Sequence, residues 1–343
     1  MPRVTILMPV FNGEPFLRET IDSVLSQTFH DFILLIINDG STDNTRDIVL
    51  SYQDDRIRLV DNEHNMGLVD TLNKGIGLTE TEYLARLDAD DLWEKTKLEK
   101  QISLLDSRPD VGLCGTSIHK FGLINGDMIF PINNDGLKVG FLFYCMMSHP
   151  SVVYRMSMLR KTGLLYKKEA FPAEDYKMWI DILQVSQIYN IPEPLVMYRQ
   201  HENQICQEKK EVQRTKTEEV QTELFLRFFP DATASDVDFY LHSYLDAKIE
   251  SSNDYKQSTL WINRVLNANK RSQYANPHLL KGSLYKFLNA NYKKYLYHKY
   301  FISRSFKNYL RYICSLEWRF LPINEYFKHL NRVFCTRCIH SFD

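Results

Sequence analysis

The first ninety residues alternate between short apolar runs and segments that have one apolar face. The runs Val4–Val10, Phe32–Ile37, Ile57–Val60 and Tyr83–Leu87 predict four strands. Helical spacing of apolar residues predicts a helix that begins near Pro15, and another is predicted over residues 67–75. Strands separated by helices are typical of a parallel α/β sheet, whose ligand crevice lies beyond the carboxyl ends of the strands.

The pattern changes twice further along the chain. After a helix from Trp93 to about Leu105, the strand candidates Val111–Lys120, Ser151–Arg155 and Leu195–Tyr198 alternate with helices, and we expect this half to receive the second substrate. From Cys206 onward the pattern is helical. We therefore predict an α/β domain over residues 1–205 and a helical C-terminal region over residues 206–343.

Charge is balanced overall but uneven along the chain. The 42 Lys and Arg against 43 Asp and Glu argue against electrostatic binding of nucleic acid. Residues 281–343 hold 12 basic and 3 acidic side chains, a net charge of +9, so the first 280 residues have 30 and 40, a net charge of −10. The same 63 residues contain 16 of the 44 aromatic side chains. This composition predicts peripheral contact with an anionic membrane. A basic helical cap on an acidic domain is the alternative.

Within this basic aromatic tail, residues 292–313 predict an amphipathic helix with tyrosines and leucines on one face and lysines and arginines on the other. No apolar run reaches the roughly 18 residues that span a bilayer, and the sequence starts without a signal-peptide pattern. We expect a cytoplasmic protein, peripheral on the inner face of the cell membrane. Cys335 and Cys338 have no second pair to complete a zinc site, so their spacing is interpreted as incidental.

Candidate functional residues follow the predicted strands. Asn12, Asp39 and Asp88 stand at three strand ends. In Asp88-Ala89-Asp90-Asp91, carboxylates one residue apart can converge on one hard divalent cation and leave positions open for phosphate oxygens, which suits Mn²⁺ or Mg²⁺. The structural alternative is a capped turn before the next helix.

Three further elements carry candidate chemistry. Asp39 can accept a hydrogen bond from the imide N–H of a nucleobase, while Ser41 or Asp43 caps the following helix. Glu174-Asp175 opens a predicted helix and can supply a general base, although helix starts favour acidic residues in any case. His201, after the last predicted strand, can complete a metal site, bind phosphate or be purely structural.

Taken in order, these segments resemble family 2 glycosyltransferases with the GT-A fold over about residues 3–205. The resemblance rests on Pro9-Val10-Phe11-Asn12, Asn38 to Asp43, Asn65-Met66-Gly67-Leu68, Leu72 to Gly75, Ala85 to Asp91, Ser148 to Ser151, Ala173-Glu174-Asp175 with Trp179, and Tyr198 to His201. Many members carry an Arg-Asn pair where this chain has Leu72-Asn73, and this departure argues against a phosphate contact there.

The resemblance implies a fold and a set of roles. The fold is α/β of the GT-A type, a Rossmann-like and mostly parallel central sheet flanked by helices, followed by an α-helical C-terminal region. Asp175 corresponds to the catalytic base, and Asp90 to the metal ligand, with His201 as a second ligand. The groups that would contact the nucleotide sugar are Pro9, Val10, Asn12, Glu14, Asp39, Arg86, Asp88, Ala89 and Asp90. His149, Glu174 and Trp179 would lie on the acceptor side.

The activity implied is an inverting, metal-dependent transfer of a hexose or N-acetylhexosamine from a UDP-sugar, which forms a β-linkage. The expected acceptor is a hydroxyl of a glycan, lipid-linked in the bacterial synthesis of O-antigen, capsule or lipopolysaccharide. A sugar-nucleotide nucleotidyltransferase is the enzymatic alternative, but residues 10–14 lack its Gly-rich loop. A dehydrogenase would need the motif Gly-x-Gly-x-x-Gly after the first strand, and residues 10–14 do not have it. A non-catalytic scaffold would bind the nucleotide sugar without turnover.

Overall fold

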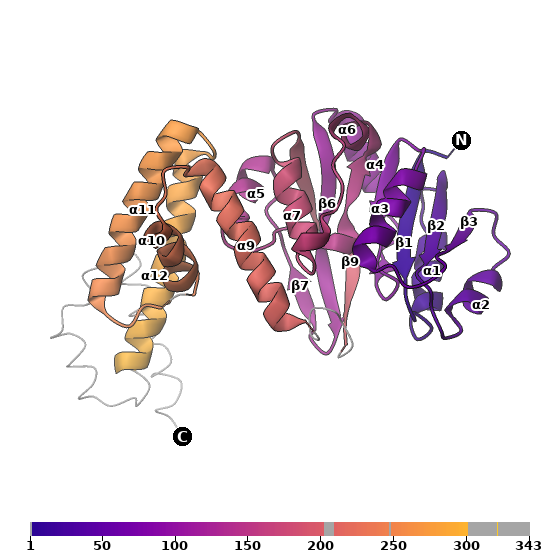
Figure 1. Cartoon of the computed structure of the whole chain (residues 1–343), viewed down its shortest axis with the longest axis horizontal. Helices are drawn as coiled ribbons and strands as arrows, with labels where there is room; N and C mark the ends of the chain where they lie inside the picture. The colour runs from indigo at the N-terminus through magenta and orange to yellow at the C-terminus, as the bar shows by residue number, and fades with distance from the viewer. Residues whose placement is uncertain (1, 202–208, 247, 301–320, 322–343) are drawn as a thin grey trace, which may run out of the picture. The chain divides into compact units, whose positions relative to one another are not determined.

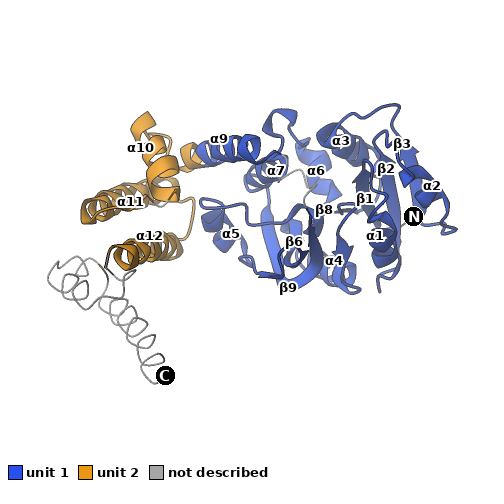
Figure 2. Ribbon diagram, turned by 90° about the horizontal axis from the view of Figure 1, so that it is seen from below, with its two compact units in different colours: residues 1–224 blue, residues 225–343 orange. Residues whose placement is uncertain are grey.

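The computed structural model describes residues 2–201, 209–246, 248–300 and 321 (Figure 1). The chain divides into two compact units, residues 1–224 and 225–343 (Figure 2). Helix α9 (Lys210–Phe228) runs from the first unit into the second. The sequence predicts a different division, between residues 205 and 206, which separates a catalytic domain from a C-terminal region. That division concerns function and stays a prediction.

The first unit is built on one mixed sheet with helices on its faces (Figure 1). Its strand order is β3-β2-β1-β4-β8-β6-β9-β5, and β7 pairs with β6. The strands are β1 (Val4–Val10), β2 (Phe32–Asn38), β3 (Ile57–Asp61), β4 (Tyr83–Arg86), β5 (Leu92–Trp93), β6 (Val111–Gly122), β7 (Gly126–Met128), β8 (Val153–Arg155) and β9 (Gln187–Gln200). The α/β class is confirmed, but the sheet is mixed because β8 runs antiparallel to both β4 and β6, and β5 antiparallel to β9.

Helices connect these strands in the order that the sequence predicts. They are α1 (Leu17–Leu25), α2 (Thr45–Leu50), α3 (Leu68–Leu78), α4 (Lys97–Ser107), α5 (Asn134–Gly140), α6 (Met156–Thr162) and α7 (Glu174–Ile182), with 3₁₀ turns η1 (His149–Ser151) and η2 (Lys168–Ala170). Strands β1, β2 and β4 pair in parallel, so their carboxyl ends lie at one edge of the sheet.

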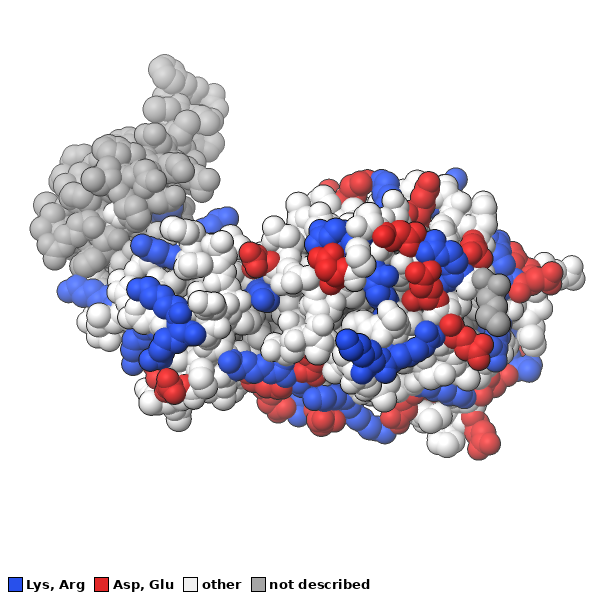
Figure 3. Space-filling view, turned by 90° about the horizontal axis from the view of Figure 1, so that it is seen from above, with Lys and Arg blue, Asp and Glu red and all other residues white. Residues whose placement is uncertain are grey.

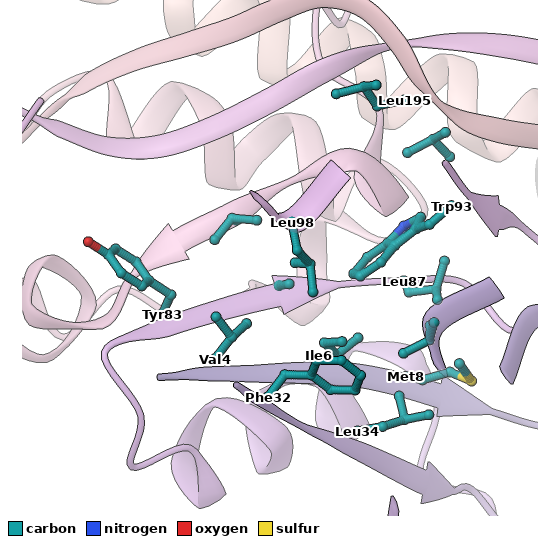
Figure 4. Packing of buried hydrophobic residues seen from close by; sticks show 14 of the residues in the cluster. Val4, Ile6, Met8, Phe32, Leu34, Tyr83, Leu87, Trp93, Leu98 and Leu195 are labelled. Carbon is teal, nitrogen blue, oxygen red and sulfur yellow. The ribbon is translucent and has the colours of Figure 1, made fainter. Parts of the chain in front are cut away.

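The core of this unit lies on the sheet face shown in Figure 4. Val4, Ile6 and Met8 of β1 point the same way because strand side chains alternate. They pack with Phe32 and Leu34 of β2, and the same cluster includes Tyr83, Leu87, Trp93 and Leu98. The intervening residue Leu7 is also buried, at 1% exposure. Both faces of β1 are therefore covered, which explains why this strand is a continuous apolar run.

Proline is tolerated at position 9 because the neighbouring strand has ended there. The Leu7 carbonyl accepts a hydrogen bond from Leu87 N (3.1 Å), and the Val10 carbonyl accepts one from Asp39 N (2.8 Å). Leu7 and Pro9 thus face the β4 side, but β1 pairs with β4 only as far as Leu7 and Arg86. The missing N–H of Pro9 costs no ladder hydrogen bond at this position.

Strand β9 is longer than predicted. The sequence indicated a strand only over Leu195–Tyr198, because Pro192 and Pro194 argue against a strand interior. In the structure, Ile191 pairs with Thr116 and Pro194 with Ser117, so Pro192 and Glu193 are extra residues in an irregularity of the β6–β9 pairing. The strand continues on both sides of it.

The second unit is helical in the part that the structure describes, as predicted. After the end of α9 it contains α10 (Ala234–Asp238), the π-helical segment η3 (Phe239–Leu245), α11 (Ser252–Ser272) and α12 (Pro277–Tyr300). Trp261 is 1% exposed, and its ring lies 4.8 Å from that of Tyr244 and 5.8 Å from that of Phe225. An aromatic cluster thus forms the centre of this unit.

Part of the predicted amphipathic helix lies in this core. Tyr292 and Leu296 are fully buried, and the Tyr292 ring lies 4.6 Å from that of Tyr255. Residues 301–313, Cys335 and Cys338 lie outside the described residues, as does most of the basic tail. For the described part, the apolar stripe is ordinary core.

The excess of basic side chains in the second unit begins only with the tail, since residues 225–280 hold 6 Lys or Arg and 6 Asp or Glu, and residues 281–300 add five lysines. Residues 225–300 hold 11 Lys or Arg and 6 Asp or Glu. Figure 3 shows one face of the molecule with these charges coloured. No helix among the described residues is both long enough and apolar enough to cross a bilayer.

Candidate active site

The loops that follow β1 and β2 are joined by side-chain hydrogen bonds. Asn12, at φ 52°, accepts a hydrogen bond at Oδ1 from Thr42 N (2.8 Å), and its own N–H donates to Ser41 Oγ (2.9 Å). The Glu14 carboxylate accepts from both the backbone N (3.1 Å) and Nδ2 (2.7 Å) of Asn44. These residues hold the two strand ends together and satisfy donors at the start of α2.

Asp39 organises the loop before α3. Asp39 is 4% exposed. Its Oδ1 accepts hydrogen bonds from Asn62 Nδ2 (2.7 Å) and Met66 N (2.8 Å), and its Oδ2 accepts one from Gly67 N (2.9 Å). The next residue, Gly40, has φ 74°, and a Cβ there would lie 2.7 Å from Asn65 N. Only glycine fits this close approach, so the Asp-Gly pair fixes the loop geometry.

Three carboxylates gather after β4. Oxygens of Asp88, Asp90 and Asp91 all lie within 4.8 Å of one another. Asp90 Oδ2 is 2.9 Å from His201 Nε2, and Asp91 Oδ1 accepts from Arg199 N (2.7 Å). Burial, and then the neighbouring Asp88 charge, raises the pKa of Asp90, and burial with Asp90 raises that of Asp91 well above its usual value. Such an excess of negative charge on oxygen ligands is suited to a hard divalent cation.

Arg86 lies beneath this cluster. It is 1% exposed and forms an ion pair with Asp88. Burial by itself lowers the pKa of Arg86, but the Asp88 carboxylate outweighs burial and the pKa lies above its ordinary range. The guanidinium is therefore a permanent positive charge behind the acidic groups.

The N-terminus of α7 presents two more carboxyl groups. Glu174 is 5% exposed, and burial, then the Asp175 charge, raises its pKa to about 8. Burial also raises the pKa of Asp175, to about 6, against the opposing effects of the Tyr176 backbone N–H and Arg86. Tyr176 N donates to Asp175 Oδ1 at 2.6 Å. At neutral pH the first group is mainly protonated and the second mainly ionised.

His149 is held by a pair of tyrosines. Its Nε2 lies 2.7 Å from the Tyr166 hydroxyl, which also hydrogen-bonds to the Tyr154 hydroxyl. The Asn73 side chain binds the Tyr166 backbone twice, donating to its carbonyl and accepting from its N–H, each at 2.9 Å. Burial lowers the pKa of His149 well below its usual value, so the ring is neutral. Trp179 packs edge-on against this ring, with centroids 5.9 Å apart.

A pocket of about 400 Å³ brings most of these groups together. The predicted site residues that line it are Arg86, Asp88, Asp90, His149, Glu174, Asp175 and His201. Other predicted site residues of the described chain do not line it. Trp179 is fully buried beneath His149. Pro9, Val10, Asn12, Glu14, Asp39 and Ala89 lie on adjacent strand ends, where Asp39 N bonds to Val10 O and Thr20 Oγ1 bonds to Ala89 O.

Some lining and supporting residues were missed by sequence reasoning. Asp91 belongs to the acidic motif but received no role, and its carboxylate is part of the cluster. Tyr166 gave no signal, since its partner Asn73 is 93 positions away in the sequence. Lys120 lines the pocket from β6, which was predicted only as a strand.

Comparison with known proteins identifies the family and agrees with the fold. Residues 5–163 match the sequence model of the family described as Glycosyl transferase family 2. An "Uncharacterized glycosyltransferase" of Haemophilus influenzae is 31% identical over 216 residues, which are 59% of this chain and 67% of that protein. The "Putative teichuronic acid biosynthesis glycosyltransferase TuaG" of Bacillus subtilis is 29% identical, over 61% of this chain and 83% of that protein.

The chain spans 65% of the length of a Rickettsia typhi glycosyltransferase that is 31% identical, and 35% of a Rickettsia felis one that is 32% identical. Among solved structures, Staphylococcus aureus TarS 1–349 in complex with UDP-GlcNAc superposes with a TM-score of 0.58 at 15% identity, over 87% of this chain and 93% of that chain. This likeness shows the fold.

The first unit thus has a GT-A sheet, an acidic cluster after β4, and a pocket that Asp88 and Asp90 of this cluster line. The sequence matches then define the family. The chain belongs to glycosyltransferase family 2.

Proposed function

We propose that this enzyme is an inverting transferase that moves a hexose or N-acetylhexosamine from a UDP-sugar to a hydroxyl of a glycan acceptor. The observation that carries the proposal is that Asp90, with its partner His201, and the ionisable Asp175 line one pocket. The structural relative TarS binds UDP-GlcNAc, which supports a UDP-linked donor.

The acidic cluster fits a Mn²⁺ or Mg²⁺ cofactor. Asp90 and His201 would hold the ion, because Asp90 Oδ2 lies 2.9 Å from His201 Nε2, the carboxylates of Asp88 and Asp91 are close by, and burial and the Asp88 charge raise the pKa of Asp90. When bound, such an ion neutralises negative charge on the departing diphosphate. Metal dependence of the transfer is part of the proposal.

The nucleotide would occupy the edge formed by β1, β2 and β4. Asp39 Oδ2 accepts a single hydrogen bond among the described residues, which leaves a lone pair for the imide N–H of a uracil base. Pro9, Val10, Asn12 and Glu14 shape the adjoining loop. Arg86, Asp88 and Ala89 would face the ribose and the diphosphate.

Asp175 acts as the general base in this proposal. It removes the proton from the acceptor hydroxyl, whose oxygen attacks the anomeric carbon from the face opposite the diphosphate, so an α-linked donor gives a β-linkage. Glu174, which is mainly protonated at neutral pH, can donate a hydrogen bond to the acceptor. His149, held by Tyr166, completes the acceptor side, and Trp179 packs beneath it.

The biological acceptor is proposed to be a lipid-linked glycan in surface-polysaccharide synthesis, as the name of TuaG suggests for that relative. Residues 1–205 would form the catalytic domain and residues 206–343 a region that contacts the anionic inner face of the cell membrane. Deleting residues 301–343, which leaves α12 with its buried Tyr292 and Leu296 in place, and measuring sedimentation with anionic vesicles tests this contact. Unchanged sedimentation removes the membrane role.

The activity is tested by a UDP-release screen over a panel of UDP-sugars with Mn²⁺ present. We expect slow donor hydrolysis with the preferred sugar, with UDP as the product. Release of pyrophosphate from a sugar phosphate and UTP would instead indicate a nucleotidyltransferase. Binding of UDP-sugars without any release, with and without glycan acceptors, would indicate the non-catalytic scaffold.

A further inference from the structure

One wall of the pocket is formed by the β6–β7 hairpin. Ile118 pairs with Met128, and Lys120 pairs with Gly126. Alternate residues of a strand face the same side, so Ile118 and Lys120 share a face, and both line the pocket together with Met128 and Phe130. This wall combines three apolar side chains with one cation.

Lys120 is a cation whose charge the described part of the chain does not compensate. Arg86, the other Lys or Arg that lines the pocket, is buried and paired with Asp88. The Lys120 ammonium group forms no ion pair and no hydrogen bond with any of residues 2–201, 209–246 or 248–300. Two carboxylates of the pocket have other partners, since Asp88 pairs with Arg86 and Asp90 with His201. Among the described residues, this charge is therefore open to a ligand that enters the pocket.

The position of Lys120 is near the acidic cluster along the sheet. It pairs with Tyr198 of the neighbouring strand β9, which also lines the pocket. His201 follows three residues later and contacts Asp90. Lys120 therefore lies towards the same end of the pocket as the proposed cation site, where a phosphoryl group would be bound. A lysine ammonium, as a compact point charge, is a common partner of phosphate oxygens.

We propose that Lys120 binds a phosphoryl group of a substrate in this pocket. This inference rests on the proposed function, because it assumes that the nucleotide-sugar donor and the glycan acceptor both bind in this pocket. Two substrates can supply the group: the diphosphate of the nucleotide sugar, or a phosphate carried by the acceptor. For the second source, the apolar residues Ile118, Met128 and Phe130 on the same wall suit a hydrocarbon portion beside the phosphate.

The test uses Lys120→Met, which keeps a long apolar stem and removes the charge. Calorimetry of the full chain would measure the affinity for UDP, with and without Mn²⁺, and for decyl phosphate, with decanol as its uncharged counterpart. We expect Lys120→Met to weaken at least one phosphoryl ligand about tenfold or more, as the loss of a charge-assisted hydrogen bond predicts. Lys120→Arg should retain the binding. Lys161→Met, at an exposed position of α6, is the matched control.

The two arms identify the source of the phosphoryl group. A loss confined to UDP assigns Lys120 to the donor diphosphate, and a loss confined to decyl phosphate assigns it to an acceptor phosphate. Wild-type affinity of Lys120→Met for both ligands, or a wild-type protein that binds neither, overturns the inference. UDP release by the wild-type enzyme is measured separately. The proposed glycosyl transfer can therefore be confirmed when the Lys120 inference fails, and the Lys120 inference can be confirmed when no UDP release is found.

Discussion

Replacing Asp175 by Asn separates chemistry from binding at this site. Asparagine has nearly the same shape, and its Oδ1 can still accept the hydrogen bond that Tyr176 N now donates to Asp175 at 2.6 Å. The substitution removes the proton acceptor and leaves Asp90, His201 and the strand-end loops unchanged. Donor binding should therefore survive while proton removal from the acceptor is lost.

The size of the effect follows from what a general base contributes. Such a group accelerates a reaction by roughly 10²–10⁴-fold, so turnover of Asp175→Asn should fall by a factor in that range. Because burial raises the pKa of Asp175 to about 6, wild-type kcat/KM should rise with pH up to about 6 and level off above it. The Asp88 charge contributes to this increase in pKa, so a cation bound beside Asp88 should move the midpoint to lower pH.

The assay is UDP release in the presence of an acceptor, measured from pH 5 to pH 8, with UDP affinity measured by calorimetry. Asp135→Asn is a matched control, because Asp135 is an exposed acidic residue in the first turn of α5 and does not line the pocket. Wild-type turnover by Asp175→Asn would refute the assignment of the base. A wild-type profile without any change between pH 5 and pH 7 would contradict the environment described for this carboxyl group.

Three further changes test other parts of the site. Asp90→Ala should abolish most of the increase in UDP affinity that Mn²⁺ gives, because its carboxylate is the proposed ligand beside His201; equal gains from Mn²⁺ in both proteins would exclude that role. Glu174→Gln should stabilise the fold at pH 9 by a few kcal/mol and much less at pH 4. The folded state raises the pKa of Glu174 from 4.5 to about 8, so its contribution to the free energy of unfolding is present below pH 4.5 and is lost as pH rises through 8. Urea unfolding at both pH values measures this difference, and an equal change at both would contradict the assigned environment. Tyr166→Phe should raise the acceptor KM or lower kcat with unchanged UDP affinity, because it frees the His149 ring; unaltered kinetics would show that the tyrosine does not position the ring.

Matched controls exist for two of these changes. Asp55 is exposed and distant from the pocket lining, so Asp55→Ala controls for the removal of a surface carboxylate. Tyr144 is 58% exposed, and Tyr144→Phe removes a hydroxyl with no expected consequence for the acceptor side.

The sequence predicts the first half of the fold well for a physical reason. Strands β1 and β2 are covered on both faces, so nearly every position is apolar and each strand is visible as a continuous run. Strand β9 is paired by β6 over most of its length and interrupted by prolines, so only its last part was predicted. The antiparallel β8 could not be oriented, since direction depends on pairing with β4 and β6.

The site shows the same difference between local and distant information. The acidic residues from Asp88 to Asp91 are adjacent in the sequence, and their convergence follows from the end of one strand. The two hydrogen bonds between the Asn73 side chain and the Tyr166 backbone join residues 93 positions apart, and no local sequence pattern indicates them. Lys120 is likewise an ordinary polar position of a strand until the pairing of β6 with β9 places it in the pocket.

We propose that a divalent cation and a nucleoside diphosphate meet at the carboxylates that follow β4. Crystals grown with UDP and Mn²⁺, measured near the manganese absorption edge, test it most directly. We expect an anomalous peak at coordination distance from the Asp90 carboxylate, with the diphosphate oxygens on its other side. A diphosphate bound in the pocket with no manganese at Asp90, or manganese bound at a different set of residues, would contradict it.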